Sequence, residues 1–181
     1  MPHEESLRQI SPYYSLMATT DNAKEALAGE SQANRKYQAF SNKAAEEGFK
    51  NVAVLYKAAS EVEAIHAKKL LKVLSMIEST GKNLEASIEG ETHEFTTMYP
   101  EFIKAAEAEK RSDAVLEFTH AMRAEEVHAG LYKKALAAVK AGNDFGREKV
   151  FLCPVCGNIE IGAAPDECPI CGTPGGRFIQ V

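Results

Sequence analysis

The chain has few of the features that mark a nucleic-acid binder, a membrane protein or a secreted protein. It carries 21 Lys and Arg against 26 Asp and Glu, a formal net charge of −5. It has no basic run and no basic residues interleaved with aromatics, so we expect no nucleic-acid partner. No apolar window is long enough to cross a bilayer. The N-terminal Met1-Pro-His-Glu-Glu lacks the basic and apolar segments of a signal peptide. We therefore expect a soluble, cytoplasmic protein without a membrane partner.

Cysteine is missing from most of the chain, and its four copies all lie near the C-terminal end. Cys153-Pro-Val-Cys156-Gly and Cys168-Pro-Ile-Cys171-Gly repeat one motif. In a reducing compartment this spacing favours metal ligation over disulfides, and it predicts a tetrahedral four-thiolate site. Each Gly follows the second Cys, where a tight turn must point amide donors at sulfur. The spacing alone fits iron and also fits a structural zinc ribbon.

The length of 181 residues gives room for one ordinary domain and one small appendage. Helical periodicity and terminal signals predict four helices and then a polar linker over 143–150. The helices are expected at about 20–48, 51–80, 84–110 with a kink at Pro100, and 112–142. We therefore predict an all-α four-helix bundle over 1–146, with 1–19 as an N-terminal extension. A small metal-bound β module is predicted over 147–181.

The helical region contains an internal repeat. Shifting the sequence by 61 residues lays 29–31 on 90–92, 43–46 on 104–107 and Val54-Leu55 on Val115-Leu116. Farther on, Glu63-Ala-Ile-His66 matches Glu125-Glu-Val-His128 at a shift of 62, which places one extra residue of the second copy after Leu116. A repeat of this length is a helical hairpin that needs a second copy to bury its apolar face.

The repeat carries a matched set of acidic and imidazole side chains. Helical spacing puts both members of each Glu-x-x-His pair on one face, and at about 1.5 Å rise per residue Glu30 lies at a similar depth to Glu63. A Glu from each of two helices plus Glu-x-x-His from each of the other two is the ligand set of di-iron carboxylate bundles. Such a site needs hard oxygen ligands and imidazoles to hold two iron ions. The predicted metal ligands of this site are Glu30, Glu63, His66, Glu91, Glu94, Glu125 and His128.

A third Glu-x-x-His, from Glu117 to His120, has no counterpart in the first copy. It lies about 12 Å along its helix from Glu125, so we predict that it is not a ligand pair. His93 points away from the predicted ligand face, and His3 lies in the N-terminal extension; both are expected to be ordinary polar residues.

With these motifs in place, the chain resembles the rubrerythrin family, in which a ferritin-like di-iron bundle is fused to a rubredoxin-like module. The run Ala28-Gly-Glu-Ser-Gln-Ala33 and Met98-Tyr99-Pro100 carry the resemblance further. It implies that Glu30 and Glu94 bind one iron, that Glu91 and His128 bind the other, and that Glu63 and Glu125 bridge. His66 is implied to replace Glu94 when that iron is reduced. Tyr37 and Tyr99 match tyrosines that orient the ligands, although core packing accounts for them as well.

The resemblance implies a peroxidase that reduces hydrogen peroxide to water, with three irons. The third iron, in the four-cysteine site, delivers electrons, and zinc there remains possible. The implied electron donor is a rubredoxin or an NAD(P)H-dependent reductase, and the implied role is defence against oxidative stress. A ferroxidase or iron-handling protein is the main alternative, and a zinc-stabilised interaction module is another.

The link between the two hairpins predicts how chains associate. The second predicted helix runs about 25 Å past Glu63, and the connector after it is only Gly81-Lys82-Asn83. Such a link is too short to cross back along a bundle. We therefore expect a homodimer that is domain-swapped, with Glu30, Glu63 and His66 of one chain meeting the ligands of the second hairpin of the other.

Overall fold

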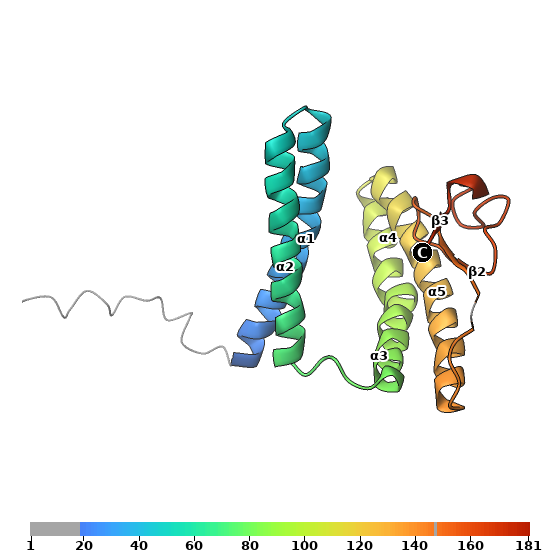
Figure 1. Cartoon of the computed structure of the whole chain (residues 1–181). Coiled ribbons are helices and arrows are strands. Elements are labelled where there is room, and N and C mark those ends of the chain that lie inside the picture. Colours follow the sequence, from blue (N-terminus) through green and yellow to red (C-terminus); the bar gives the residue numbers. More distant parts are fainter. Residues whose placement is uncertain (1–18, 147) are drawn as a thin grey trace, which may run out of the picture. The chain divides into compact units, whose positions relative to one another are not determined.

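The computed structural model describes residues 19–146 and 148–181, so most of the predicted N-terminal extension, including His3, lies outside the described residues. Figure 1 shows helices along most of the chain and short strands near the C-terminal end. The elements are α1 Thr19–Glu46, α2 Lys50–Val73, α3 Thr80–His93, the π-helical segment η2 Glu94–Met98, α4 Tyr99–Ala108, α5 Ser112–Lys140, β1 Val150–Leu152, β2 Ile159–Ile161, the 3-10 turn η3 Gly175–Arg177 and β3 Ile179–Gln180. The predicted all-α fold class with a small β module is confirmed.

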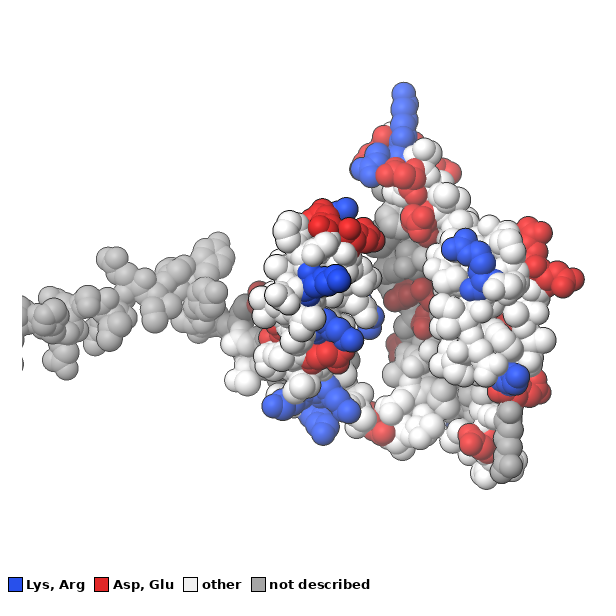
Figure 2. All heavy atoms as spheres, turned by 45° about the horizontal axis from the view of Figure 1, so that its top comes forward, with Lys and Arg blue, Asp and Glu red and all other residues white. Residues whose placement is uncertain are grey.

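The chain divides into two compact units, one ending at Ile77 and the other running from Glu78 to Val181. The first unit contains the α1–α2 hairpin. The second contains α3, η2, α4 and α5 together with a three-stranded antiparallel sheet in the order β2-β1-β3. In the described part of the chain, no helix is both long and apolar enough to span a membrane. On the face drawn in Figure 2, acidic and basic side chains are interspersed over the described helices.

Four helices end in the same hydrogen-bonded turn, and only two of these ends carry the glycine that sequence reasoning relies on. After α1, the amides of Gly48 and Phe49 donate to the carbonyls of Ala45 and Ala44, and Gly48 has φ +86°. Gly142 ends α5 in the same way, with φ +76°. Both ends were predicted from the sequence.

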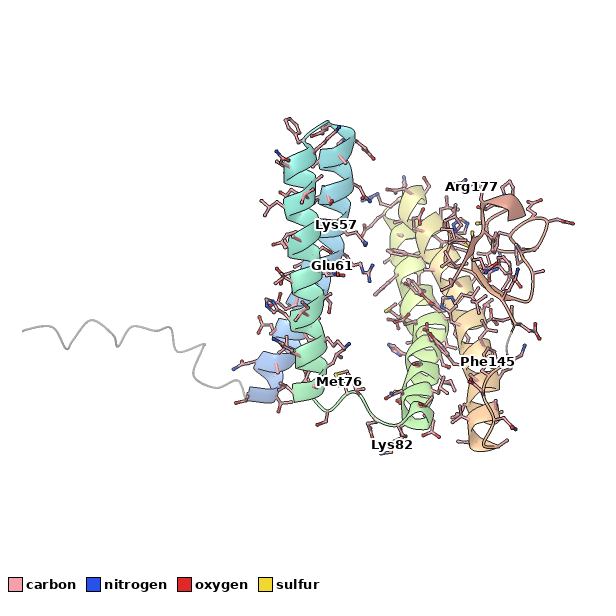
Figure 3. All side chains as sticks on the ribbon, in the orientation of Figure 1. Lys57, Glu61, Met76, Lys82, Phe145 and Arg177 are labelled. Atoms are coloured by element: carbon pink, nitrogen blue, oxygen red, sulfur yellow. The ribbon has the colours of Figure 1, made fainter. Side chains whose placement is uncertain are left out.

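The end of α2 was predicted wrongly. The helix stops at Val73, where Ser75 adopts φ +54° and Met76 donates to Leu71. A serine in the left-handed conformation is uncommon, so no sequence signal marked the turn. The connector is therefore residues 74–79, and Gly81 lies inside α3, whose first turn is capped by Ser79 accepting from the amide of Lys82. Figure 3 shows Met76 in this connector and Lys82 at the start of α3.

The predicted kink at Pro100 takes the form of a π-helical turn just before it. Segment η2 spans Glu94–Met98, and the amide of Tyr99 donates to the carbonyl of Glu94, five residues back. Pro100 then falls in the first turn of α4, where its missing N–H costs no helical hydrogen bond. A π turn adds one residue to a helix and often lies at a functional site.

The π turn also corrects the place of the extra residue in the repeat. The rings of Tyr37, Phe40 and Tyr56 form one aromatic cluster in the first hairpin. Tyr99, Phe102 and Phe118 form its copy in the second hairpin. Each pair of counterparts is 62 positions apart, whereas Glu30 and Glu91 are 61 apart. The insertion therefore lies between Glu91 and Tyr99, at η2, and not after Leu116.

Small side chains let α1 and α2 approach closely and fix their register. Ala44 and Ala53 are buried, as is Ser60 at 5% exposure. The Ser60 hydroxyl donates to the carbonyl of Asn34, and the Asn34 amide donates back to the Ser60 carbonyl at 2.7 Å. Because both bonds join the middle of one helix to the middle of the other, they hold Glu30 and Glu63 at matching depth.

Candidate metal centres

The four cysteines of the C-terminal module converge on one point. Their sulfur atoms lie within 4.8 Å of one another, with Cys153 Sγ 3.6 Å from Cys171 Sγ and Cys156 Sγ 3.5 Å from Cys168 Sγ. A tetrahedral four-thiolate site with metal–sulfur bonds of about 2.3 Å has sulfur–sulfur edges of about 3.8 Å. The sulfurs are therefore spaced to hold one metal ion.

The two cysteine loops, which we call the first knuckle (Cys153–Gly157) and the second knuckle (Cys168–Gly172), have the same backbone. Gly157 and Gly172 have φ +79° and +74°, and each donates its amide to the carbonyl of the first Cys of its knuckle. Any other residue at these two glycines would be strained. Thr173 is buried, at 6% exposure, and its hydroxyl lies 3.1 Å from Cys171 Sγ, where it can donate to a metal-bound thiolate.

The thiols of Cys153, Cys156 and Cys168 do not ionise alike without a metal. Burial would raise the pKa of Cys153, but the amides of Cys156 and Val155 lower it to about 6. Burial raises the pKa of Cys156 and of Cys168. Four thiolates crowded together in a buried site require a cation, so this donor set fits a tightly bound metal.

A carboxylate–histidine cluster lies in the second unit. Glu91 of α3 with Glu125 and His128 of α5 bring ligand atoms within 4.8 Å of one another. His128 Nδ1 lies 2.7 Å from Glu125 Oε2, and both side chains are less than a fifth exposed. Burial, and then hydrogen bonding and charge repulsion from Glu125, raise the pKa of Glu91 to about 7.

The first unit holds the matching cluster of Glu30, Glu63 and His66. His66 Nδ1 lies 3.0 Å from Glu63 Oε2 and 3.7 Å from Glu30 Oε1. A hydrogen bond with Glu63, followed by burial, raises the pKa of Glu30. Two carboxylates and an imidazole thus converge in each hairpin, as the repeat predicted.

Glu94 and Tyr99 lie at the two ends of the π turn. Glu94 does not belong to the cluster of Glu91, Glu125 and His128. Burial and then the charge of Glu125 raise the pKa of Glu94. Burial, and then the charges of Glu125 and Glu94, also raise the pKa of Tyr99, so its phenol keeps its proton at neutral pH. Tyr37, its counterpart, packs in the aromatic cluster of the first hairpin.

His128 also touches the four-cysteine module. Its Nε2 lies 2.9 Å from the carbonyl oxygen of Gly157, in the first knuckle. Because a carbonyl oxygen can only accept, Nε2 carries the hydrogen. In the neutral imidazole, the Nδ1 lone pair is then directed at Glu125 and is available to a metal.

The pair Glu117 and His120, which the sequence predicted not to be a ligand pair, does not join a cluster. Among the described residues, neither Glu117 nor His120 belongs to any group of converging metal-ligand atoms. His120 instead lines a hollow beside the α4–α5 turn. His93 also stays out of the grouped ligands and lies near Glu94.

Comparison with known proteins identifies the family. Residues 21–136 match the family model described as rubrerythrin, and residues 151–179 match the model of the rubrerythrin rubredoxin-like domain. The chain belongs to the rubrerythrin family. It is 37% identical over 175 residues to nigerythrin from Nitratidesulfovibrio vulgaris, covering 89% of this chain and 85% of the relative. It is 33% identical over 174 residues to rubrerythrin-2 from Clostridium acetobutylicum, covering 88% and 95%.

Solved structures give the same result. A fully reduced, all-ferrous nigerythrin matches with a TM-score of 0.55 and 34% identity, over 96% of this chain and 91% of that chain. A mixed-valence nigerythrin matches with a TM-score of 0.54 and 36% identity, covering 92% of this chain and 88% of that chain. Membership makes the helical domain ferritin-like and brings a di-iron carboxylate site and a rubredoxin-like four-cysteine site.

Sequence reasoning missed one residue beside the second cluster. Burial, and then the charges of Glu91 and Glu125, raise the pKa of Tyr132 of α5. Tyr132 follows Glu125 by seven positions and His128 by four, which puts it on the same face of α5. That spacing was a usable signal. Tyr132 supplies a second protonated phenol near these carboxylates.

We predict that the metal-free chain loses stability as the pH rises from about 5 to 8. The folded-state pKa of Glu91 is raised to about 7, so the folded chain binds its proton more tightly than the unfolded chain, and that stability disappears as the pH rises through the folded pKa. With the partial exposure of Glu91 discounted, the effect is about 1 kcal/mol, or about 2–4 °C in Tm. Thermal melts of chelated protein measure it. Glu91→Gln should flatten the profile, and an unchanged slope would contradict the prediction.

Proposed function

We propose that this chain is a peroxidase that reduces hydrogen peroxide to water, with electrons delivered through the four-cysteine site. The contact of His128 with both centres carries the proposal: Nδ1 faces Glu125 and Nε2 binds the Gly157 carbonyl. One imidazole thus joins the carboxylate–histidine cluster to the first knuckle. Family membership supports an oxidoreductase of this kind.

The donor sets fit iron in both places. Glu30, Glu63, His66, Glu91, Glu94, Glu125 and His128 would hold two ions, with carboxylate oxygens offsetting the positive charge and imidazoles completing the sites. Cys153, Cys156, Cys168 and Cys171 would hold a third, and zinc, which has no accessible redox change, would break the electron path. Bound iron supplies one-electron redox changes and Lewis acidity, which these side chains lack.

The protein's own contribution is to place protonated groups beside the carboxylates. Reduction of one peroxide to two waters consumes two electrons and two protons. Tyr99 and Tyr132 keep their phenolic protons because burial and neighbouring carboxylates raise their pKa values. They are therefore available as hydrogen-bond donors near the carboxyl groups.

An external reductant must replace the electrons. We infer a rubredoxin or an NAD(P)H-dependent reductase as the donor, entering at the four-cysteine module, and a role in defence against peroxide. The free thiols favour a reducing compartment such as the cytoplasm.

Rapid mixing of reduced, iron-loaded protein with peroxide tests the function. We expect the di-iron centre to oxidise much faster than free ferrous iron, followed by reoxidation of the thiolate-bound iron. Oxidation no faster than that of free ferrous iron would contradict the proposal. Rapid reaction with dioxygen alone, together with a closed multi-subunit shell by light scattering, would favour the ferroxidase alternative.

We propose further that the two clusters combine across a domain-swapped homodimer. A ferritin-like bundle has one long crossover connection. Residues 74–79 span at most about 22 Å, whereas the 24-residue helix α2 is about 36 Å long. The revised connector is longer than the sequence suggested, yet it is still too short to return along the bundle.

Complementation between two inactive variants tests the swap. One variant carries Glu63→Ala and His66→Ala, and the other carries Glu125→Ala and His128→Ala. In a swapped mixed dimer, one of the two sites receives two intact hairpins, so co-expression should restore peroxidase activity that neither variant has alone. In an unswapped dimer both sites remain damaged, and absence of rescue in isolated mixed dimers would refute the swap.

A further inference from the structure

The strands of the module lie beside α5 (Figure 1). Hydrogen bonds hold the module on α5 at two points, one for each cysteine knuckle. The first knuckle is bound through Gly157 and His128, as described above. The second is bound by Arg123, one and a half helical turns before His128. Arg123 Nη1 donates to the carbonyl of Ile170 at 3.1 Å, and its Nη2 donates to the carbonyl of Pro169 at 2.9 Å.

The carbonyls that Arg123 binds belong to the two peptide groups that contact a ligand sulfur. The Pro169–Ile170 peptide presents its N–H, that of Ile170, to Cys168 Sγ, and the Ile170–Cys171 peptide presents the N–H of Cys171 to the same sulfur. Each peptide group therefore accepts a hydrogen bond from the guanidinium at its carbonyl and donates one from its N–H to the sulfur, which makes it a hydrogen-bond relay. Hydrogen bonds in such a chain polarise and strengthen one another.

The positive charge of Arg123 can polarise these two peptide groups because no carboxylate among the described residues is paired with it. A planar guanidinium presents two N–H groups side by side in a fixed fork that fits two neighbouring acceptors, whereas a lysine ammonium is a point charge on a flexible stem.

We propose that Arg123 is a positioning residue that docks the second knuckle on α5 and raises the reduction potential of the four-cysteine site. The potential of a thiolate-bound iron depends on hydrogen bonds to its sulfurs, and donors favour the reduced, more negative state. Arg123 strengthens two such donors from outside the module. The inference rests on the proposed electron-delivering role of this site, but it requires no reaction with peroxide.

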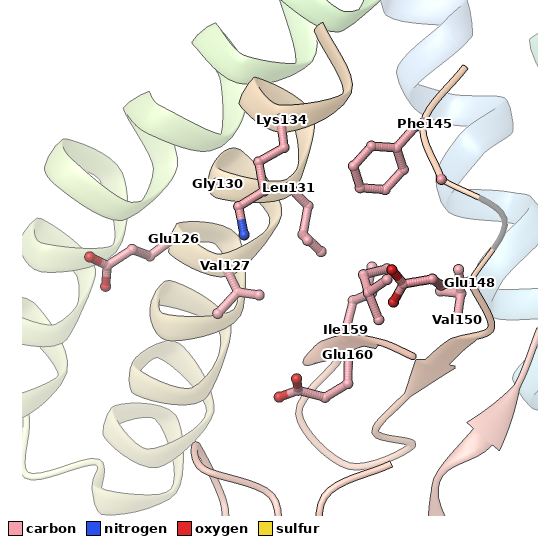
Figure 4. Close-up of a pocket in the computed structure, with 12 residues that line it drawn as sticks. Glu126, Val127, Gly130, Leu131, Lys134, Phe145, Glu148, Val150, Ile159 and Glu160 are labelled. Atoms are coloured by element: carbon pink, nitrogen blue, oxygen red, sulfur yellow. The ribbon is translucent and has the colours of Figure 1, made fainter. Parts of the chain in front are cut away.

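A hollow separates α5 from the sheet on the other side of this contact. It has a volume of about 800 Å³ (Figure 4). Apolar side chains such as Val127, Leu131 and Ile159 line it together with the charged side chains of Glu126, Lys134, Glu148 and Glu160. Because this part of the boundary is not tightly packed, the hydrogen bonds of Arg123 and His128 carry much of the docking.

The decisive measurement is the midpoint potential of the four-cysteine iron, followed through its thiolate absorption. In Arg123→Gln the reduction equilibrium constant should fall about threefold to tenfold, which is about 30–60 mV lower in potential. Arg123→Lys keeps the charge but loses the planar fork that pairs with the two carbonyls, so its potential should lie between those of Arg123→Gln and the wild type. Full restoration by lysine would overturn the relay and leave a simple charge effect.

Lys110→Asn is the matched control. Lys110 lines the hollow beside the α4–α5 turn, as do Arg123 and Ile170, but among the described residues it makes no hydrogen bond or ion pair with the module. Asparagine tolerates its backbone conformation of φ +58°. This variant also removes one positive charge and should leave the potential within about 10 mV of wild type. A shift equal to that of Arg123→Gln would overturn the proposal.

Hydrogen exchange on zinc-loaded protein tests the docking separately from any redox property. Arg123→Gln should speed exchange of the Ile170 and Cys171 amides at least about tenfold while leaving the α1–α2 hairpin unchanged. Unchanged exchange at these amides would overturn the docking role. Because neither readout uses peroxide, their failure is distinct from failure of the peroxidase proposal.

Discussion

We expect replacement of Glu125 and His128 together by glutamine to abolish metal binding at the carboxylate–histidine centre and, under the proposed function, to lower peroxide turnover at least about 100-fold. The two side chains lie 2.7 Å apart. Of the neighbouring charges, that of Glu125 raises the pKa of Glu91 and of Glu94 the most. Iron analysis should fall from about three ions per chain towards about one, the ion in the four-cysteine site. The fold should survive, because glutamine keeps the volume and removes charge repulsion.

The chain contains its own matched control for this experiment. Glu117 and His120 have the same spacing on the same helix, but they lie outside every group of converging ligand atoms among the described residues. Changing both to glutamine should leave iron content and turnover within about twofold of wild type, as expected for a substitution away from a site. An equal loss in both double variants would mean that the effect is general damage to α5.

Removing the metal from the four-cysteine site unfolds the module and leaves the helices intact. The buried core of the module consists of Cys153, Cys156 and Cys168, with Ile170, Cys171 and Phe178 packed against it. Its strands have only two or three residues. A domain this small needs a metal or disulfides, and structural zinc in comparable sites contributes about 10–16 kcal/mol.

Cys156→Ser together with Cys168→Ser produces the same state without a chelator. Hydrogen exchange should show loss of protection at the β1–β2 pairs, while the helical circular dichroism signal stays within about a tenth of wild type, since α1 to α5 keep their own contacts. Val155→Ala is the control, because Val155 lies in the first knuckle and is 47% exposed. Retained protection in the double serine variant would show that the module folds without its metal.

The parts of this fold that the sequence predicted were those with a local physical signal. Gly48 and Gly142 marked two helix ends because glycine alone adopts the left-handed conformation without strain. Ser75 and Lys110 adopt the same conformation at two other helix ends. Serine and lysine rarely adopt this conformation, so their identity did not indicate that a helix ends there. The change of shift from 61 to 62 showed that the second copy has an extra residue, but the alignment did not place it at the π turn of Glu94–Met98.

The sequence alone predicted the chemical groups of both sites, which are two carboxylate–histidine sets in register with a repeat and four cysteines in two knuckles. Spacing suffices there, because residues three or four apart on a helix share a face and a Cys-x-x-Cys turn brings its sulfurs together. The three-dimensional structure was needed to show that Tyr132 lies near the carboxylates of the second cluster and that His128 binds Gly157. It was also needed to show that Arg123 binds the carbonyls of Pro169 and Ile170. The last two contacts join residues 29 to 47 positions apart. They depend on how the module packs on α5, which no local pattern encodes.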